Sequence, residues 1–253
     1  GRSLTVLALR TPDLEVSVEN RIAVICHKES GRYFQSNVEV LPHDLRTALQ
    51  VRQPRVSNRF GIGLLFVVMS ALVGQLLFLG LASPGQAGLD SILPLVMFAF
   101  LTIAVHEAGH VLALRWFGRK ADKVGFKLHF VVLPAFYVRM NESLLLSKYE
   151  KVVVHSAGIG ANVILNSIAI VVNIAVLHSD GLLFAIQLMV LSLVFNAVPF
   201  LNSDGYRVIL ALTGTNELKS KLANPWWVKA LKLTSVVLVL WYTWSWVSPL
   251  LNR

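Results

Sequence analysis

Several features that would point to other classes of protein are missing from this sequence. A single cysteine, Cys26, excludes a disulfide within the chain, and it suits the reduced thiol of a cytoplasmic segment. We find no internal repeat, no low-complexity segment and no cleavable signal peptide. Because the chain begins with Gly1 rather than Met, we expect it to be a processed or truncated piece of a longer protein.

Apolar residues are present in large excess. Hydrophobic residues make up 55% of the 253 positions, and the mean hydropathy is +0.63. A soluble core of this size could not bury so much apolar surface. Five apolar stretches are long enough to cross a bilayer: Gly61–Ala82, Ser91–Phe117, Val152–Leu177, Leu182–Phe200 and Leu231–Leu250. We therefore expect a mainly α, polytopic membrane protein with about five transmembrane helices.

Basic residues cluster in one set of connections around these stretches. The net charge is +9, yet the connections Ser83–Asp90 and His178–Gly181 contain neither Lys nor Arg. The basic residues lie before the first stretch (Arg52, Arg55 and Arg59), between the second and third, and between the fourth and fifth. The positive-inside rule then predicts a cytoplasmic amino terminus and an outer carboxyl terminus, in what we expect to be a bacterial cytoplasmic membrane. The basicity therefore reflects topology, and we expect no nucleic-acid partner.

The segment His106-Glu107-Ala108-Gly109-His110 lies inside the second apolar stretch. Ionisable groups are costly in hydrocarbon unless something binds or pairs them, so they indicate a reactive site. Residues i and i+4 project from one face of a helix, so both imidazoles can bind one tetrahedral Zn²⁺ ion, with Glu107 beside its open position. Glu107 could take a proton from water activated by the metal and pass it to a leaving amine. The alternative is coincidence, which we place at roughly one chain of this length in a hundred.

The depth of this segment follows from the predicted topology. His106 precedes Arg115 by nine positions, which places it roughly 13 Å from the cytoplasmic end of its helix. We expect one zinc ion per chain, reached from the cytoplasm.

A third metal ligand is predicted where the fourth apolar stretch breaks. A catalytic zinc usually has three protein ligands and one open position. Pro and Gly interrupt the helix within Asn196–Tyr206, and Asp204 lies at this break. Asp204 is the best candidate, because Asp90 and Asp180 lie in the opposite connections and Asp122 lies in the basic one. The alternative role for Asp204 is a helix N-cap.

The third apolar stretch carries a polar stripe. His155, Asn162, Asn166 and Asn173 fall within about 40° of one another on a helix. Asn166 and Asn173 are expected to form hydrogen bonds between helices. Asn162, at a depth comparable to that of the histidine pair, is placed at the site, and we expect it to bind substrate together with Asn196.

Residues 1–58 are predicted to form a small cytoplasmic segment, and residues 59–253 a membrane-embedded zinc protease domain. Alternation and turn signals within Arg21–Phe34 favour a hairpin, and His43–Gln53 is typical of a helix. Because so short a segment would be marginal alone, we expect it to dock on something.

A second, membrane-associated β-hairpin is predicted after the second apolar stretch. Val124–Val132 and Ala135–Arg139 are rich in β-branched and aromatic residues, and they are separated around Pro134. An edge strand here could hold an extended substrate by strand addition, or the hairpin could be merely structural. We expect His129 to be a packed or interfacial residue and not a metal ligand.

Three motifs in the segment from about Leu95 to Leu212 resemble those of the site-2 protease family of intramembrane zinc metalloproteases. They are His106-Glu107-x-x-His110, the small-residue segment Ala157–Asn162, and Asp204-Gly205. The resemblance implies zinc ligation by His106, His110 and Asp204, and general-base catalysis by Glu107. Two positions depart from the family pattern: Ile159 replaces a usual Pro, and Ser203 an often-found Leu.

One branch of this family is similar in more detail. The form Asn196-x-x-Pro199-Phe200-Leu201-x-x-Asp204-Gly205-Tyr206 resembles the branch associated with maturation of ribosomally made peptides. The hypothesis is an intramembrane zinc metalloendopeptidase that hydrolyses a peptide bond at the cytoplasmic side of the bilayer, with a peptide or a membrane protein as substrate. The alternatives are release of a membrane-tethered regulator, and a non-proteolytic metal-binding transporter or scaffold.

Overall fold

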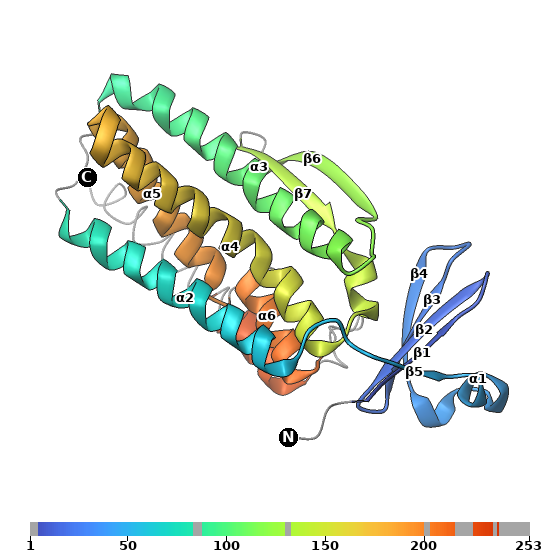
Figure 1. Cartoon of the computed structure of the whole chain (residues 1–253). Coiled ribbons are helices and arrows are strands. Elements are labelled where there is room, and N and C mark those ends of the chain that lie inside the picture. Colours follow the sequence, from blue (N-terminus) through green and yellow to red (C-terminus); the bar gives the residue numbers. More distant parts are fainter. Residues whose placement is uncertain are drawn as a thin grey trace.

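The centre of the fold is a bundle of four long helices (Figure 1). The computed structural model describes residues 5–82, 88–129, 133–199, 203–215, 225–234 and 237. The four helices are α2 (Asn58–Leu81), α3 (Ile92–Trp116), α4 (Lys148–Val172) and α5 (Asp180–Ala197). A small β-sheet lies at one end of the bundle (Figure 1). Helices α2 and α4 begin at this end, and helices α3 and α5 finish there.

The outer surface of this bundle is apolar. Among the described residues, four helical segments are long and apolar enough to cross a membrane: Asn58–Leu81, Leu89–Trp116, Lys148–Leu177 and Asp180–Ala197. At most 28% of the most apolar window of any of them is buried, so side chains such as Phe66, Leu77 and Met97 face outward. Such a surface suits lipid. The fifth predicted span, residues 231–250, falls almost wholly outside the described residues.

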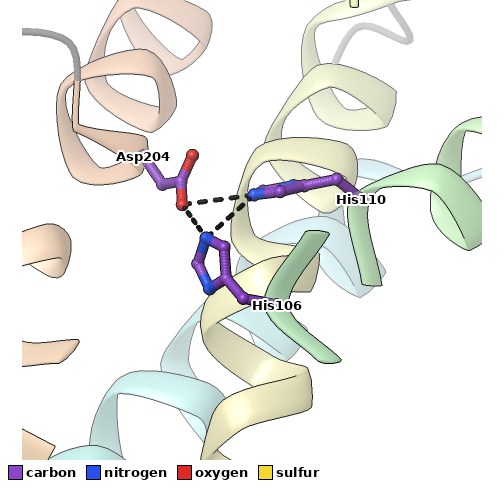
Figure 2. Close-up of side chains that lie close together, drawn as sticks. All are labelled: His106, His110 and Asp204. Carbon is purple, nitrogen blue, oxygen red and sulfur yellow. Dashed lines mark hydrogen bonds and ion pairs between the residues drawn. The ribbon is translucent and has the colours of Figure 1, made fainter. Parts of the chain in front are cut away.

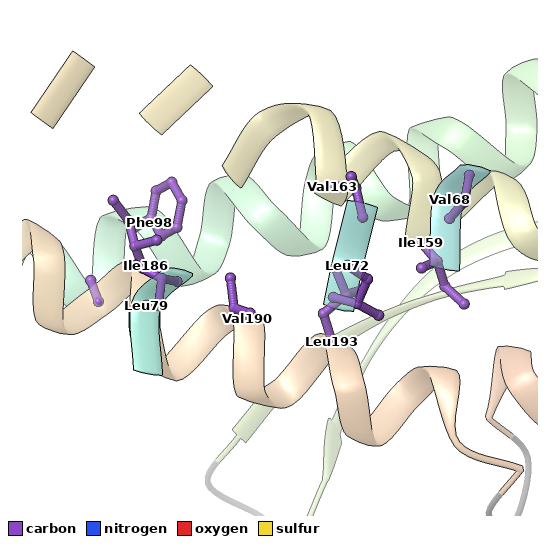
Figure 3. Close-up of a cluster of buried hydrophobic side chains, with 10 residues drawn as sticks. Val68, Leu72, Leu79, Phe98, Ile159, Val163, Ile186, Val190 and Leu193 are labelled. Carbon is purple, nitrogen blue, oxygen red and sulfur yellow. The ribbon is translucent and has the colours of Figure 1, made fainter. Parts of the chain in front are cut away.

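Close packing holds the four helices together. Val68 and Leu72 of α2 meet Ile159 of α4, and Val190 and Leu193 of α5 join the same cluster (Figure 3). Because lipid tails are as apolar as these side chains, packing and hydrogen bonds between helices must supply the attraction. One such bond comes from the buried Gln75 of α2, whose side-chain NH₂ donates to the carbonyl oxygen of Val163, 2.7 Å away, on α4.

The amino-terminal segment forms a five-stranded antiparallel sheet with the order β4-β3-β2-β1-β5. The strands are β1 (Val6–Arg10), β2 (Leu14–Glu19), β3 (Ile22–His27), β4 (Arg32–Asn37) and β5 (Gln50–Arg52). The predicted hairpin is confirmed as β3 and β4, with Gly31 in the left-handed conformation (φ 61°) that the turn requires. The predicted helix His43–Gln53 is wrong beyond Thr47. Helix α1 (His43–Thr47) is followed by β5, because Gln50–Arg52 pairs with β1.

This sheet docks on the end of the helix bundle through charged contacts. The carboxylate of Glu19 in β2 accepts a hydrogen bond from the backbone N–H of Lys148, the first residue of α4, at 2.9 Å. Arg52 of β5 forms an ion pair of 2.6 Å with the fully buried Glu150 of α4. Burial, partly offset by the hydrogen bond from Lys148, raises the pKa of Glu19 above its usual value. The segment therefore docks on the chain's own helix bundle.

A second hairpin follows α3, as predicted. Strands β6 (Lys123–His129) and β7 (Leu133–Arg139) pair antiparallel beside α3 (Figure 1). Pro134 lies within β7, opposite Leu128, and not at the turn, because the pairing continues through His129 and Leu133.

Short elements connect the helices and strands of the core. They are η1 (Val38–Val40), η2 (Leu89–Ser91), η3 (Asn141–Leu145) and the π-helical turn η4 (Asn173–Leu177). Helix α5 ends at Ala197, and α6 (Asp204–Thr213) then packs against α4. The hydroxyl oxygen of Ser203 accepts from the N–H of Tyr206 at 3.1 Å, so Ser203 is the N-cap of α6. Asp204, considered above as a cap, is thus the first helical residue, and its carboxylate is available to face the bundle.

Candidate metal centre

Helix α3 brings the two predicted histidine ligands to one point. His106 and His110 lie one turn apart, and their Nε2 atoms are 3.2 Å apart. His110 is only 2% exposed, and the two rings meet edge to face at 84°. Their ring nitrogens therefore converge in a buried position, as the i, i+4 spacing predicts.

The break between α5 and α6 brings Asp204 to the same point. Its Oδ2 atom lies 2.7 Å from Nε2 of His106 and 3.2 Å from Nε2 of His110 (Figure 2). The three side chains form a group that could hold a metal ion, with their ligand atoms all within 4.8 Å of one another. Ligands of a tetrahedral zinc ion lie roughly 3.3 Å apart, so a small outward shift of Asp204 would fit zinc. Two imidazoles and one carboxylate match the ligands of a catalytic site, which keeps a fourth position open.

A backbone carbonyl on α4 orients His110. Nδ1 of His110 lies 2.7 Å from the carbonyl oxygen of Val154. An N–H donated from Nδ1 to this oxygen leaves the lone pair of Nε2 directed at the centre of the group. Metal-binding histidines commonly use this arrangement, which fixes both the tautomer and the ring orientation.

Asn162 of α4 is suited to orient His106 in the same way. Its side-chain nitrogen lies 3.3 Å from Nδ1 of His106, while its Oδ1 is buried and has no hydrogen-bond partner. The oxygen and nitrogen of an amide side chain exchange places on a half-turn. After that turn, Oδ1 of Asn162 accepts the N–H of His106 Nδ1, which pairs the buried oxygen and frees Nε2 for a metal.

Asn196, in the last turn of α5, holds Asp204 in position through two hydrogen bonds. Its side-chain NH₂ donates to Oδ2 of Asp204 at 2.7 Å, and its Oδ1 accepts the backbone N–H of Asp204 at 3.2 Å. These two bonds hold α6 to α5 across the helix break. Both predicted substrate-binding asparagines, Asn162 and Asn196, therefore lie against the predicted ligands, and their contact with substrate stays a prediction.

Glycines leave the space that this group occupies. A Cβ atom on Gly158 of α4 would lie 2.5 Å from Nε2 of His110 and 2.7 Å from Nε2 of His106. A Cβ atom on Gly109 would lie 2.7 Å from the carbonyl oxygen of Ala157, so glycine allows α3 and α4 to approach closely. The small-residue pattern of the third apolar stretch thus makes room for the imidazoles as well as for helix packing.

A comparison with known proteins identifies a relative of this chain. It is 32% identical over 256 residues to a protein of Bacillus subtilis (strain 168) that is named "Putative peptide zinc metalloprotease protein YydH". The match covers 98% of this chain and 100% of that protein. The chain belongs to the YydH family. No protein-family model matches it, and no solved structure matches at a significant level.

The relative's name and the geometry of this chain both point to a metal site. The name of the YydH protein refers to zinc and to a peptide. In this member of the family, His106, His110 and Asp204 form a possible metal group. Glu107 lies on the same turn of α3, is partly buried, and is near enough to both imidazoles to interact with them electrostatically.

The other polar residues of the stripe do not belong to this group. Asn166 is completely buried, and neither atom of its amide has a hydrogen-bond partner, so the predicted bond between helices is not formed there. Asn173 exchanges two hydrogen bonds with the backbone of Ser179, at the turn into α5. His155 is also buried, and its Nδ1 atom has no partner. Sequence spacing puts all four residues on one face, but only Asn162 is opposite α3 at the depth of His106.

Proposed function

We propose that this member of the YydH family is an intramembrane zinc metalloendopeptidase of the site-2 protease type. The observation that carries the proposal is the convergence of His106, His110 and Asp204 at a helix break, beside Glu107. The chemistry of these donors suits zinc. When bound, zinc supplies a Lewis acid that polarises a peptide carbonyl and makes water a better nucleophile.

The chain's own residues divide the remaining work. Glu107 accepts a proton from the attacking water and then donates it to the nitrogen of the leaving amine. Val154 and Asn162 hold the two imidazoles in orientation, and Asn196 holds the carboxylate of Asp204. A preorganised arrangement of this kind lowers the reorganisation needed during the reaction.

The place of cleavage follows from the basic connections. The metal group lies towards the end of the bundle at which α3 ends and the sheet docks, and the positive-inside rule assigns that end to the cytoplasm. The substrate would be a peptide or an unwound membrane segment, because an intact helix hides its backbone from the metal. An extended substrate could add to the β6–β7 hairpin, which lies beside α3.

Maturation of a ribosomally made peptide is the more specific role that we favour. The name of the relative refers to a peptide, and the Asn196-to-Tyr206 segment resembles the peptide-maturation branch. Release of a membrane-tethered regulator is the alternative within the same chemistry. Both roles require the same four residues at the site.

A matched pair of variants tests the proposed hydrolysis. Wild type and Glu107→Gln, both purified in detergent and loaded with zinc, are incubated with a library of unstructured peptides, and new termini are identified by mass spectrometry. Both proteins are expected to hold one zinc ion, whereas only wild type cleaves, with a rate advantage of roughly 10²–10⁴-fold. Equal cleavage by the two would remove Glu107 from the mechanism. Bound zinc without any cleavage, together with metal flux into vesicles, would favour a transporter.

A further inference from the structure

A polar cavity lies between the amino-terminal sheet and the ends of α4 and α6. Its volume is about 390 Å³, within the range of small-ligand sites. Strands β2 and β3 form one wall, and α4, α6 and the segment after β7 form the others. The ionisable residues and the histidine in its lining are Glu19, Arg139, Lys148, Lys151, His155 and Arg207.

The charges around this cavity are unbalanced. Four cationic side chains line it, from β7, α4 and α6, against the single carboxylate of Glu19. That carboxylate already accepts the backbone N–H of Lys148. Among the described residues, no acidic side chain forms an ion pair with Arg139 or Arg207. Like charges that converge on a partly enclosed space attract an anion.

His155 adds a further polar side chain to the cavity. It lines the cavity from α4 and is only 8% exposed. With the four cationic side chains it makes this part of the wall polar, which suits a polar ligand more than an apolar one.

The cavity adjoins the metal group through two helices. The carbonyl oxygen that orients His110 belongs to Val154, the residue before His155. Arg207 follows Asp204 by one turn of α6. A ligand in the cavity therefore lies next to the two elements that hold the predicted ligands, and an extended chain could pass from one site to the other.

We propose that this cavity binds a carboxylate-bearing segment of the peptide substrate and so positions the neighbouring bond for cleavage; this inference rests on the proposed function. The hydrogen-bonding groups of Ser17, Asn20 and Asn141 in the lining suit a peptide backbone. The carboxylate belongs to an Asp or Glu side chain or to the carboxyl terminus of the peptide. The cavity thus defines an acidic peptide as the preferred substrate.

Binding can be measured without cleavage. The full-length Glu107→Gln protein in detergent is titrated into fluorescent peptides that share one apolar scaffold and carry a Glu-Glu, a Gln-Gln or a Lys-Lys pair, all with an amidated carboxyl terminus. A Gln-Gln peptide with a free carboxyl terminus is the fourth probe, and fluorescence anisotropy gives the Kd of each. Since hydrolysis is not required, failure of the proposed protease activity would leave this result unchanged.

The Glu-Glu peptide is expected to bind roughly tenfold more tightly than its Gln-Gln counterpart. Arg207→Gln and Arg139→Gln should each reduce this preference, whereas Arg207→Lys should keep it, because the charge remains. Arg59→Gln is the matched control, since Arg59 is exposed at the start of α2 and does not line the cavity. Tight binding of the Gln-Gln peptide only when its carboxyl terminus is free would assign the cavity to a terminal carboxylate.

Three results would overturn the inference. The first is equal binding of the Glu-Glu amide, the Gln-Gln amide and the Gln-Gln peptide with a free carboxyl terminus when the cavity side chains are unchanged. The second is a loss of preference in Arg59→Gln equal to that in Arg207→Gln. The third is displacement of the Glu-Glu peptide by phosphatidylglycerol vesicles but not by phosphatidylcholine vesicles, which would assign the cavity to a lipid headgroup.

Discussion

Replacing Gly158 by alanine tests the position of both imidazoles with one methyl group. The added Cβ would lie 2.5 Å from Nε2 of His110 and 2.7 Å from Nε2 of His106, whereas ordinary van der Waals contact begins at 3.4 Å. The two rings would therefore have to move by roughly 0.7–0.9 Å, more than the tolerance of about 0.5 Å for a working site. His110 is also held by its bond to Val154, so such a shift would disturb its orientation.

We expect Gly158→Ala to weaken zinc binding about 100-fold, or about 2.7 kcal/mol. The assay is competition for zinc between the purified protein and a fluorescent chelator, and the visible spectrum of the Co²⁺ form reports ligand geometry. Gly160→Ala, on the same helix as Gly158, is the control, because its Cβ would meet only Cγ2 of Val68 of α2, at 3.3 Å. If Gly158→Ala bound zinc as tightly as Gly160→Ala, with an unchanged Co²⁺ spectrum, the imidazoles would not lie against Gly158 and the described metal group would be wrong.

Three further changes address the surroundings of the metal group and the docked sheet. Asp204→Ala should lower the zinc content of the purified protein well below one ion per chain, and undiminished zinc by elemental analysis would exclude Asp204 as a ligand. Asn162→Leu should weaken zinc binding about tenfold, and Asn162→Asp should restore part of it, because a carboxylate oxygen can accept the N–H of His106; equal affinities for the two variants would contradict this orienting role. Burial raises the pKa of Glu19, so the ionised form of this carboxyl destabilises the folded state, and its contribution to stability falls as the pH rises through the raised pKa. The thermal midpoint of Glu19→Gln minus that of wild type should therefore increase as the pH rises from about 4.5 towards neutrality. Differential scanning fluorimetry measures this difference, and a difference that does not change with pH would contradict the raised pKa of Glu19.

Features that depend on local spacing could be predicted from the sequence. Four apolar runs became helices long enough to cross a membrane, and the i, i+4 spacing placed His106 and His110 on one face of α3. The chain geometry of a single helix determines both properties. The hairpin β3–β4 was predictable for the same reason, since its turn signal and its strands are adjacent in sequence.

Features that depend on long-range contacts were less accessible. The sequence did not indicate β5, because Val51 joins the sheet only by pairing with Leu7, far away in the chain. The fit of Glu19 to the start of α4 likewise joins segments more than a hundred residues apart. The cavity beneath the sheet results from this docking, so no local pattern could reveal it.

The metal group combines both kinds of information. By itself, the sequence determined that two histidines and a glutamate lie inside an apolar helix, because helical periodicity needs no partner. Tertiary structure alone decided that Asn196 holds Asp204 in place and that Gly158 leaves room for the rings. Those arrangements depend on how α4, α5 and α6 pack against α3, and packing between residues 94 to 98 positions apart is a property of the whole fold.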